Sequence, residues 1–353
     1  MGKIKIFVFA RLKPSQIDYK IIPLSKSALV ERVFVLRKTP LIVNSIKVEC
    51  IALPKILRLR IFYWLFTSIY GAWVIKKNGA DLIVSYNIFP HGFNGFFASL
   101  LTKKPFVFAE INEDTLYYYK NPIFRTIIKK ILHRANYITV PGSRTEERWR
   151  FYGYEKIIKL HSTINTDVFC PAVKEKNIDF LFIGEFDKNK RPDLILDVFT
   201  EIRSKGFDIS ICFIGFGKLN KLLESEIKRR RLNNYAQIVK TSNVLEYLSN
   251  SKILVMASLS EGLPCVLLEA MACELVVVIP PVGDITDVVK HGVNGFLHDN
   301  SKEGIGNGML EAYKNFDKLG NLRKRARETI IHEHSYQVAE KKWNDLLSKI
   351  QTK

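Results

Sequence analysis

Short runs of β-branched and aromatic residues alternate with helical patterns along most of the chain. Strands and helices that alternate in this way are typical of parallel sheets in an α/β architecture. The expected strands are Lys3–Phe9, Asp81–Tyr86, Phe106–Phe108, Tyr137–Val140, Asp179–Ile183, Ile209–Ile214, Ile253–Met256 and Leu275–Ile279. The expected helices are Ile56–Lys77, Asn94–Leu101, Pro122–Arg134, Arg144–Tyr152, Pro192–Lys205, Lys218–Arg230 and Pro264–Cys273. Several strands are apolar at every position, which suits sheets that are covered on both faces.

The alternation restarts near the middle of the chain. A polar, charged stretch at Val173–Asn177 precedes a fresh strand at Asp179. The 353 residues are enough for two ordinary domains, so we expect two Rossmann-like domains facing a cleft. We place the boundary near residues 165–177 and divide the chain into residues 1–168, 169–333 and 334–353. The last part contains the expected helix Tyr336–Ile350.

The net charge of +19 favours anionic partners, which include nucleic acid, acidic lipid and phosphorylated small molecules. The cysteines argue against a disulfide scaffold and against a zinc site, because their number is odd and they form no Cys-x-x-Cys pair. They are Cys50, Cys170, Cys212, Cys265 and Cys273. The first residues do not read as a secretory signal, so we expect a cytoplasmic protein.

The most apolar stretch is Ile61–Ile75, about 15 residues and shorter than the roughly 20 that span a bilayer. Thr67, Ser68 and Gly71 interrupt it, which indicates a buried or interfacial helix. The cations that precede it, as in an interfacial segment, are Lys55, Arg58 and Arg60. Packing on the first sheet is the alternative. Peripheral attachment to the inner face of the cell membrane is a hypothesis motivated by the net charge.

The strand-to-helix turn at residues 258–272 is the strongest candidate for a functional site, because open parallel sheets bind ligands at the carboxyl ends of their strands. A polar loop, Ser258–Gly262, leads to Pro264, which suits the first turn of a helix. Free N–H groups at a helix start bind anions. Glu261 and Glu269 could accept hydrogen bonds there from a polyhydroxylated ligand such as a ribose or a sugar. The alternative is that both are ordinary helix charges.

The run Glu261–Ala272 is similar to the Glu-x7-Glu signature of glycosyltransferase family 4, whose members are retaining enzymes with the GT-B fold of two Rossmann-like domains. Four other segments resemble that family in the same order: Phe182–Phe199, Cys212–Gly217, Val282–Val289 and His291–Leu297. The resemblance covers roughly residues 135–297. It implies a transferase of the hexosyltransferase type that moves a sugar from a nucleotide-diphosphate donor to a hydroxyl acceptor in polysaccharide or glycolipid assembly. It also implies a C-terminal helix that crosses back to the first domain.

The resemblance assigns roles to particular residues. Glu269 would hold the ribose hydroxyls, and Glu261 would lie beside the donor sugar. Lys190 would offset charge on the departing diphosphate, although it could instead be a surface charge in a basic run. The backbone of Gly262, Leu263 and Pro264 would approach the sugar and the diphosphate. The other donor-binding candidates are Gly184, Arg191 and Gly215.

The sequence departs from the family pattern in two loops of the second half. Glu185 stands where the family usually has arginine, and a carboxylate beside a diphosphate is repulsive. Either Arg191 or Lys188 substitutes, or Glu185 turns away, or activity is weakened. The usual Gly-Gly pair of a later loop is Gly283-Asp284 here.

The first half offers fewer candidates. His91 follows an expected strand where the family often has a histidine near the donor sugar and the acceptor, so we take it as a catalytic candidate with Glu261 and Lys190. A lone histidine is more often structural. Arg11 and Glu110 are candidate acceptor-binding residues, although Arg11 could merely solvate a loop. His332 and His334 resemble a metal pair only superficially. We therefore expect no metal and no cofactor besides the nucleotide-sugar co-substrate.

Three other functions remain open. A nucleotide-sugar epimerase or a sugar-phosphate synthase would keep the fold. A non-catalytic transferase partner would explain Glu185 and the lack of paired glycines after the first strand. A nucleic-acid-binding protein would explain the charge, but the sequence lacks the corresponding motifs. The partners we expect are a nucleotide-diphosphate-sugar donor, a glycan or lipid-linked acceptor and, as a hypothesis, an anionic membrane surface, with no nucleic acid.

Overall fold

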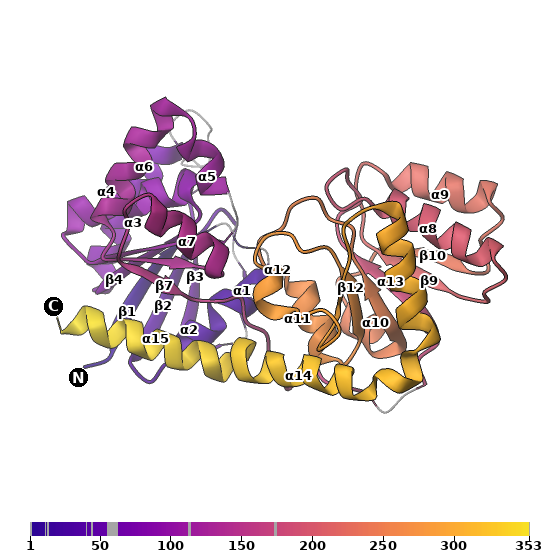
Figure 1. The fold of residues 1–353 in the computed structure, drawn as a ribbon. Helices are drawn as coiled ribbons and strands as arrows, with labels where there is room; N and C mark the ends of the chain where they lie inside the picture. Colours follow the sequence, from indigo (N-terminus) through magenta and orange to yellow (C-terminus); the bar gives the residue numbers. More distant parts are fainter. Residues whose placement is uncertain are drawn as a thin grey trace. The chain divides into compact units, whose positions relative to one another are not determined.

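The computed structural model describes residues 2–10, 12, 14–39, 41–43, 45–54, 63–111, 114–172 and 175–352, which form two compact units (Figure 1). The first unit comprises residues 1–163 and 336–353, and the second comprises residues 164–335. The units divide a few residues away from the expected boundaries at 168 and 333. The reason is local: the N–H of Ile164 donates to the carbonyl of His334 at 2.9 Å, and Ile164 forms a parallel bridge with Ser335. The chain passes between the units at residues 163–164 and 335–336, and the paired residues Ile164 and Ser335 therefore both belong to the second unit.

The first unit is built on a seven-stranded, fully parallel sheet in the order β3-β2-β1-β4-β5-β6-β7. Its strands are β1 (Ile4–Phe9), β2 (Val30–Arg37), β3 (Val48–Ala52), β4 (Leu82–Tyr86), β5 (Phe106–Ala109), β6 (Tyr137–Val140) and β7 (Ile157–Lys159). Its helices are α1 (Pro14–Lys20), α2 (Ile22–Lys26), α3 (Tyr63–Asn78), the π-helical turn η2 (Ile88–Gly92), α4 (Phe93–Thr102), α5 (Asp114–Tyr119), α6 (Pro122–Arg134), α7 (Ser143–Phe151) and α15 (Tyr336–Gln351). The expected helix start at Ile56 lies outside the described residues.

Alternating residues of β1 supply two separate cores, because successive strand side chains point to opposite faces of a sheet. Phe7 and Phe9 pack in the core under α3, α4 and α6. Ile6 and Val8 pack in the core on the other face, which also contains Trp343 of α15 (Figure 1). The C-terminal helix thus returns to the first unit, as expected.

The second unit has a six-stranded parallel sheet in the order β10-β9-β8-β11-β12-β13. Its strands are β8 (Ile178–Ile183), β9 (Ile211–Ile214), β10 (Ala236–Val239), β11 (Ser251–Val255), β12 (Val276–Ile279) and β13 (Phe296–Leu297). Its helices are α8 (Pro192–Ser204), α9 (Asn220–Arg229), α10 (Leu245–Asn250), α11 (Cys265–Ala272), α12 (Ile285–Val288), α13 (Lys302–Lys314), the 3-10 turn η3 (Phe316–Leu319) and α14 (Gly320–His334). The expected α/β architecture with two parallel-sheet domains is confirmed.

The strand order reverses beside β8 in the second unit. The chain adds β9 and β10 on one side of β8 and then returns to place β11 on the other side. Phe180 and Leu181 of β8 pair with Ile253 and Leu254 of β11. The loops that follow these two strands therefore emerge side by side at the carboxyl edge of the sheet, at a topological switch point where open α/β sheets bind ligands.

Candidate active site

The loop between β8 and α8 is shaped by Asp187. Its carboxylate oxygen Oδ1 accepts hydrogen bonds from the N–H groups of Asn189 at 3.0 Å and Lys190 at 2.8 Å. Aspartate commonly caps its own loop in this way. Arg191 then adopts the left-handed conformation, with φ of 49°, and Pro192 begins α8. This turn fixes the Lys190 backbone at the carboxyl end of β8.

Asn189 fastens this loop to the one that follows β11. Its side-chain amide donates to the carbonyl of Ser260 at 3.0 Å and accepts from the Ser260 N–H at 3.1 Å. Its own carbonyl accepts from the N–H of Leu259 at 2.9 Å. Because all three bonds join the same two loops, Lys190 and Glu261 are held close together.

Lys190 and Glu261 form an ion pair between the Lys190 ammonium and Oε1 of Glu261. The two side chains are 22% and 9% exposed, so the pair is mostly withdrawn from water without being sealed off. The sequence placed both residues in the candidate site, and the structure brings them into contact. When a ligand binds at this switch point, the cation can pair with a phosphate group of the ligand, and the carboxylate can accept hydrogen bonds from its hydroxyl groups.

Two glycines let neighbouring loops approach the two loops that carry this pair. A Cβ on Gly215, after β9, would lie 1.9 Å from the carbonyl oxygen of Gly184. A Cβ on Gly283, whose φ is +61°, would lie 2.0 Å from the carbonyl oxygen of Glu261 and 2.6 Å from that of Gly262. Asp284 also donates its N–H to the Gly262 carbonyl at 3.1 Å. The family usually has two glycines here. Gly283 is the one that this chain keeps, and the contact with Glu261 and Gly262 requires a glycine at that position.

Arg191 binds the protein's own loops in the structure. Its Nε donates to the carbonyl of Ala257 at 2.6 Å, and its guanidinium also contacts the carbonyl and side-chain oxygens of Asn300. The donor-binding role of this residue stays a prediction. Its contacts hold the segment after β11 in place, and Lys190 is the cation of this loop that meets Glu261.

His298 and Asn300 complete this support and were missed by the sequence reasoning. The Nε2 atom of His298 lies 2.9 Å from the carbonyl of Met256, and its Nδ1 accepts from the N–H of Asn300 at 3.0 Å. Burial lowers the pKa of His298, so the ring is neutral with its proton on Nε2. Asn300 donates its side-chain amide to the carbonyl of Ser258 at 2.9 Å. Both residues lie within three positions after the His291–Leu297 segment. Their closeness to a segment that resembles the family is the signal that could have identified them.

Glu269 lies in α11 and is 5% exposed. Pro264 stands at the N-cap of α11, one position earlier than expected, and the helix begins at Cys265. The side chain of Leu263, in the turn before the helix, is buried. The first N–H groups of a helix have no intrahelical acceptor, and they attract anions.

Glu185 has an exposed side chain, whereas the next residue, Phe186, is buried in the core. Phe186, and not Glu185, therefore occupies the inward-facing position of this loop.

His91 and Glu110 belong to the first unit, each just after a strand of its sheet. His91 lies in η2 and is buried. Glu110 follows β5, is also buried, and accepts a hydrogen bond from Nε1 of Trp149. Arg11 lies outside the described residues.

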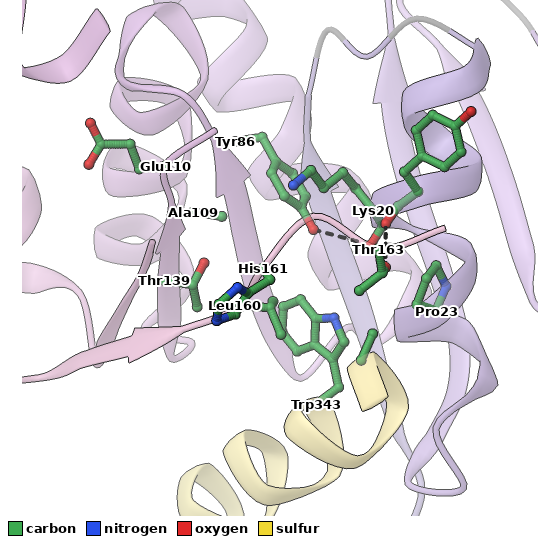
Figure 2. Close-up of a pocket in the computed structure, with 12 residues that line it drawn as sticks. Lys20, Pro23, Tyr86, Ala109, Glu110, Thr139, Leu160, His161, Thr163 and Trp343 are labelled. Atoms are coloured by element: carbon green, nitrogen blue, oxygen red, sulfur yellow. Dashed lines mark hydrogen bonds between the residues drawn. The ribbon is translucent and has the colours of Figure 1, made fainter. Parts of the chain in front are cut away.

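Glu110 lines a small pocket at the carboxyl edge of the first sheet (Figure 2). Lys20, Tyr86 and Thr163 gather at one side of the pocket, and Glu110 stands apart from them. The Tyr86 hydroxyl donates to the carbonyl of Lys20 at 3.4 Å, and burial raises the pKa of Tyr86. The cavity measures about 10 Å³, which is room for one water molecule and not for a sugar.

Among the described residues, no three side chains of His, Cys, Asp or Glu gather as a metal site would require. His334 is fully buried at the end of α14.

Comparison with known proteins gives matches to both the sequence and the fold. Residues 164–329, nearly all of the second unit, match the family model described as glycosyl transferases group 1. The uncharacterized glycosyltransferase MJ1178 of Methanocaldococcus jannaschii is 26% identical over 271 residues, which cover 73% of this chain and 72% of that protein. The amylovoran biosynthesis glycosyltransferase AmsD of Erwinia amylovora is 24% identical over 218 residues, 61% of this chain and 60% of that protein. The crystal structure of Anabaena Alr3699/HepE in complex with UDP superposes with a TM-score of 0.79 at 15% identity, over 99% of this chain and 100% of that one.

Proposed function

We propose that the chain, whose second unit matches the group 1 glycosyl transferases, transfers a sugar, with retained anomeric configuration, from a nucleoside diphosphate to a hydroxyl group. The observation that carries this proposal is the ion pair of Lys190 and Glu261. It joins the loops after two adjacent parallel strands, at the switch point of the sheet.

Lys190 is the group we assign to the leaving diphosphate. Negative charge builds up on the diphosphate as the bond to the sugar breaks, and an ammonium fixed beforehand near that charge lowers the barrier. Glu261 holds this ammonium in place before the donor arrives. When phosphate oxygens replace Glu261 as its partner, the carboxylate becomes available to the hydroxyls of the donor sugar.

Glu269 and the start of α11 are the groups we assign to the nucleotide. A carboxylate accepts two hydrogen bonds, which matches the paired hydroxyls of a ribose. The N–H groups of the first turn of α11 add positive potential for the phosphates. With Lys190 and this helix start supplying positive charge, we propose turnover without a metal ion, which activity in excess chelator would test.

We give neither glutamate the role of a glycosidase acid, base or nucleophile. Glu261 is already paired with a cation, and Glu269 is assigned to the nucleotide. The work of the protein is to hold donor and acceptor together and to stabilise the departing group. His91 is the residue of the first unit that we propose for contact with the reacting sugar.

The acceptor we propose is a glycan or a lipid-linked glycan in polysaccharide assembly. The amylovoran biosynthesis enzyme supports this, since its name places it in such a pathway. The complex of Alr3699/HepE with UDP makes uridine diphosphate sugars the first donors to test.

The test is slow transfer of the donor sugar to water, because it needs no knowledge of the acceptor. The protein is incubated with a panel of nucleotide sugars, and proton NMR records the anomer that is released first. We expect one donor to be hydrolysed and to release, before mutarotation, the anomer that the donor itself carries, which is the α-anomer for an α-linked donor. Release of the opposite anomer would contradict retention. No release from any donor by a protein that binds nucleoside diphosphate would favour the non-catalytic partner.

A further inference from the structure

Helices α3 and α4 of the first unit carry many large apolar side chains on the outside. In α3, Trp64 is 43%, Ile69 48% and Trp73 52% exposed, whereas Thr67 and Ser68 are each 1% exposed. In α4, Leu100 and Leu101 are exposed, whereas Asn94 and Ser99 are fully buried. This distribution is the reverse of the usual one for helices on the surface of a globular protein.

Close packing through small and polar residues explains the buried side of both helices. Ser68 of α3 donates to the side-chain oxygen of Asn94 of α4 at 3.1 Å. A Cβ on Gly71 would lie 2.4 Å from the ring of Phe9, and one on Gly95 would lie 2.0 Å from the hydroxyl of Ser85. A larger residue does not fit at either glycine. Helices packed in membranes share this use of small residues.

The outward side chains form one surface, which we call the apolar face. Its residues are Trp64, Leu65, Phe66, Ile69 and Trp73 of α3 with Leu100 and Leu101 of α4. The two helices pack against each other on the same side of the first sheet (Figure 1). A group of exposed large apolar side chains on neighbouring helices marks a site of interaction.

The charged side chains of the helices on this side of the first sheet have a single sign. The helices α3, α4 and α6 contain no aspartate or glutamate. Their basic residues, with the two lysines that follow α4, are Lys76, Lys77, Lys103, Lys104, Arg125, Lys129, Lys130 and Arg134. Lys77 lies over the ring of Trp73 with its ammonium 4.9 Å from the ring centre. The partner of this surface is therefore apolar where it meets the helices and anionic around them.

We propose that the apolar face docks on a bilayer that contains anionic lipids, with α3 lying in the plane of the interface. No described helix is long and apolar enough to cross a membrane, and α3 has 16 residues. Tryptophan beside lysine, at the edge of a leucine and isoleucine surface, is the composition that interfacial helices use. Lysines near an anionic bilayer add attraction that salt weakens.

The apolar face adjoins the segment that carries His91. Trp64 stacks on Phe89 of η2 with ring centres 5.6 Å apart, and Phe89 stands two residues before His91. Docking would thus bring this part of the first unit to the membrane surface, where a lipid-linked acceptor is found. That consequence rests on the proposed function, whereas the docking itself does not.

The test measures binding of the full chain to vesicles by flotation. Vesicles of phosphatidylcholine alone are compared with vesicles that contain phosphatidylglycerol. Tryptophan emission provides a second readout, because Trp149 and Trp343 are buried and any change on binding reports Trp64 and Trp73. We expect binding to the anionic vesicles with a blue shift of the emission.

The variant Leu65→Glu/Ile69→Glu tests the apolar face itself. Both side chains are about half exposed, so the fold should tolerate the change. Vesicle binding should fall at least tenfold. The matched control is Leu222→Glu, an exposed leucine of α9 in the second unit, which should bind as the wild type does. Replacing Lys76 and Lys77 by alanine should weaken binding about fivefold for each lysine.

Three results would overturn the proposal. One is no binding of the wild type to anionic vesicles. Another is equal binding by the wild type and Leu65→Glu/Ile69→Glu. The third is binding that moderate salt abolishes, with no change in tryptophan emission, because simple charge attraction would then suffice. Nucleotide binding by the same proteins is measured in parallel, so a failure of docking is distinguishable from a failure of the proposed transferase function.

Discussion

Replacing Gly283 by alanine should disable the donor site through the backbone alone. Gly283 has a φ of +61°, and its missing Cβ leaves room for the carbonyl oxygens of Glu261 and Gly262. The added methyl group would lie 2.0 Å from the Glu261 oxygen. An ordinary carbon–oxygen contact is about 3.3–3.6 Å, so the two loops must separate by more than about 1 Å. Glu261 moves with its backbone, and its pairing with Lys190 is lost or distorted.

The expected size of the effect has two parts. Left-handed backbone at a residue with a side chain costs about 1–2 kcal/mol. Displacement of a positioning group by about 1 Å can lower turnover by roughly 100-fold. The first part lowers stability, and the second lowers donor use.

Gly292 provides the matched control, because its φ is +72° but an added Cβ would meet nothing within 4 Å. Gly292→Ala should lower the melting temperature by about 2–4 °C for each kcal/mol and leave nucleotide binding unchanged. Gly283→Ala should lower the melting temperature further and weaken nucleoside diphosphate binding at least tenfold, as measured by calorimetry. Equal nucleotide affinity in the two variants would refute the reasoning.

Three further predictions concern single side chains. Lys190→Ala should weaken nucleoside diphosphate binding by about 10- to 100-fold in calorimetry, the range expected for a hydrogen bond to a charged group, whereas Lys188→Ala, an exposed lysine of the same loop, should have little effect. Burial lowers the pKa of His298, so the unfolded chain binds a proton at higher pH than the folded chain does, and stability falls as pH drops below about 6.5. Melting temperatures measured between pH 7.5 and 5.5 should fall less in His298→Asn than in the wild type. An equal fall in both proteins would exclude His298 as a source of the pH dependence. Trp149→Phe removes the N–H donor of the buried Glu110 carboxylate and should cost about 1–3 kcal/mol in denaturant unfolding, and a loss near zero would show that this contact does not stabilise the first unit.

Most strands that the sequence predicted contain a continuous apolar run. The strand β2 was missed although Val33–Leu36 is such a run, which the structure buries after the exposed Glu31 and Arg32. The strands β7 and β13, with three and two residues, are too short to give a pattern. Gly304, Gly306 and Gly308 hide the helix α13, although Gly308 is needed there because a Cβ would lie 2.9 Å from Val278. Tertiary packing determines that these segments form strands and a helix, and such packing cannot be read from the local sequence pattern.

The candidate site divides in the same way. Lys190, Glu261 and Glu269 could be predicted as site residues because the resemblance aligns whole segments around them. The hydrogen bonds of Arg191 could not be predicted, because its partners, the carbonyl of Ala257 and Asn300, are more than 60 residues away in the sequence. The support from His298 is equally invisible, since its partner is the carbonyl of Met256 and any residue type could supply that atom.

Thermal stabilisation by nucleoside diphosphates tests the central claim, that the second unit binds the donor through the loops after β8 and β11. The wild type is compared with Glu269→Ala and with Glu303→Ala, which removes an exposed carboxylate of α13 in the same unit. A nucleotide present far above its dissociation constant should stabilise the wild type and Glu303→Ala by a few kcal/mol, about 2.7 at a 100-fold excess. We predict that one nucleotide does so and that Glu269→Ala loses the effect. Stabilisation of the folded wild type by no nucleotide, or equal stabilisation of Glu269→Ala, would contradict the account.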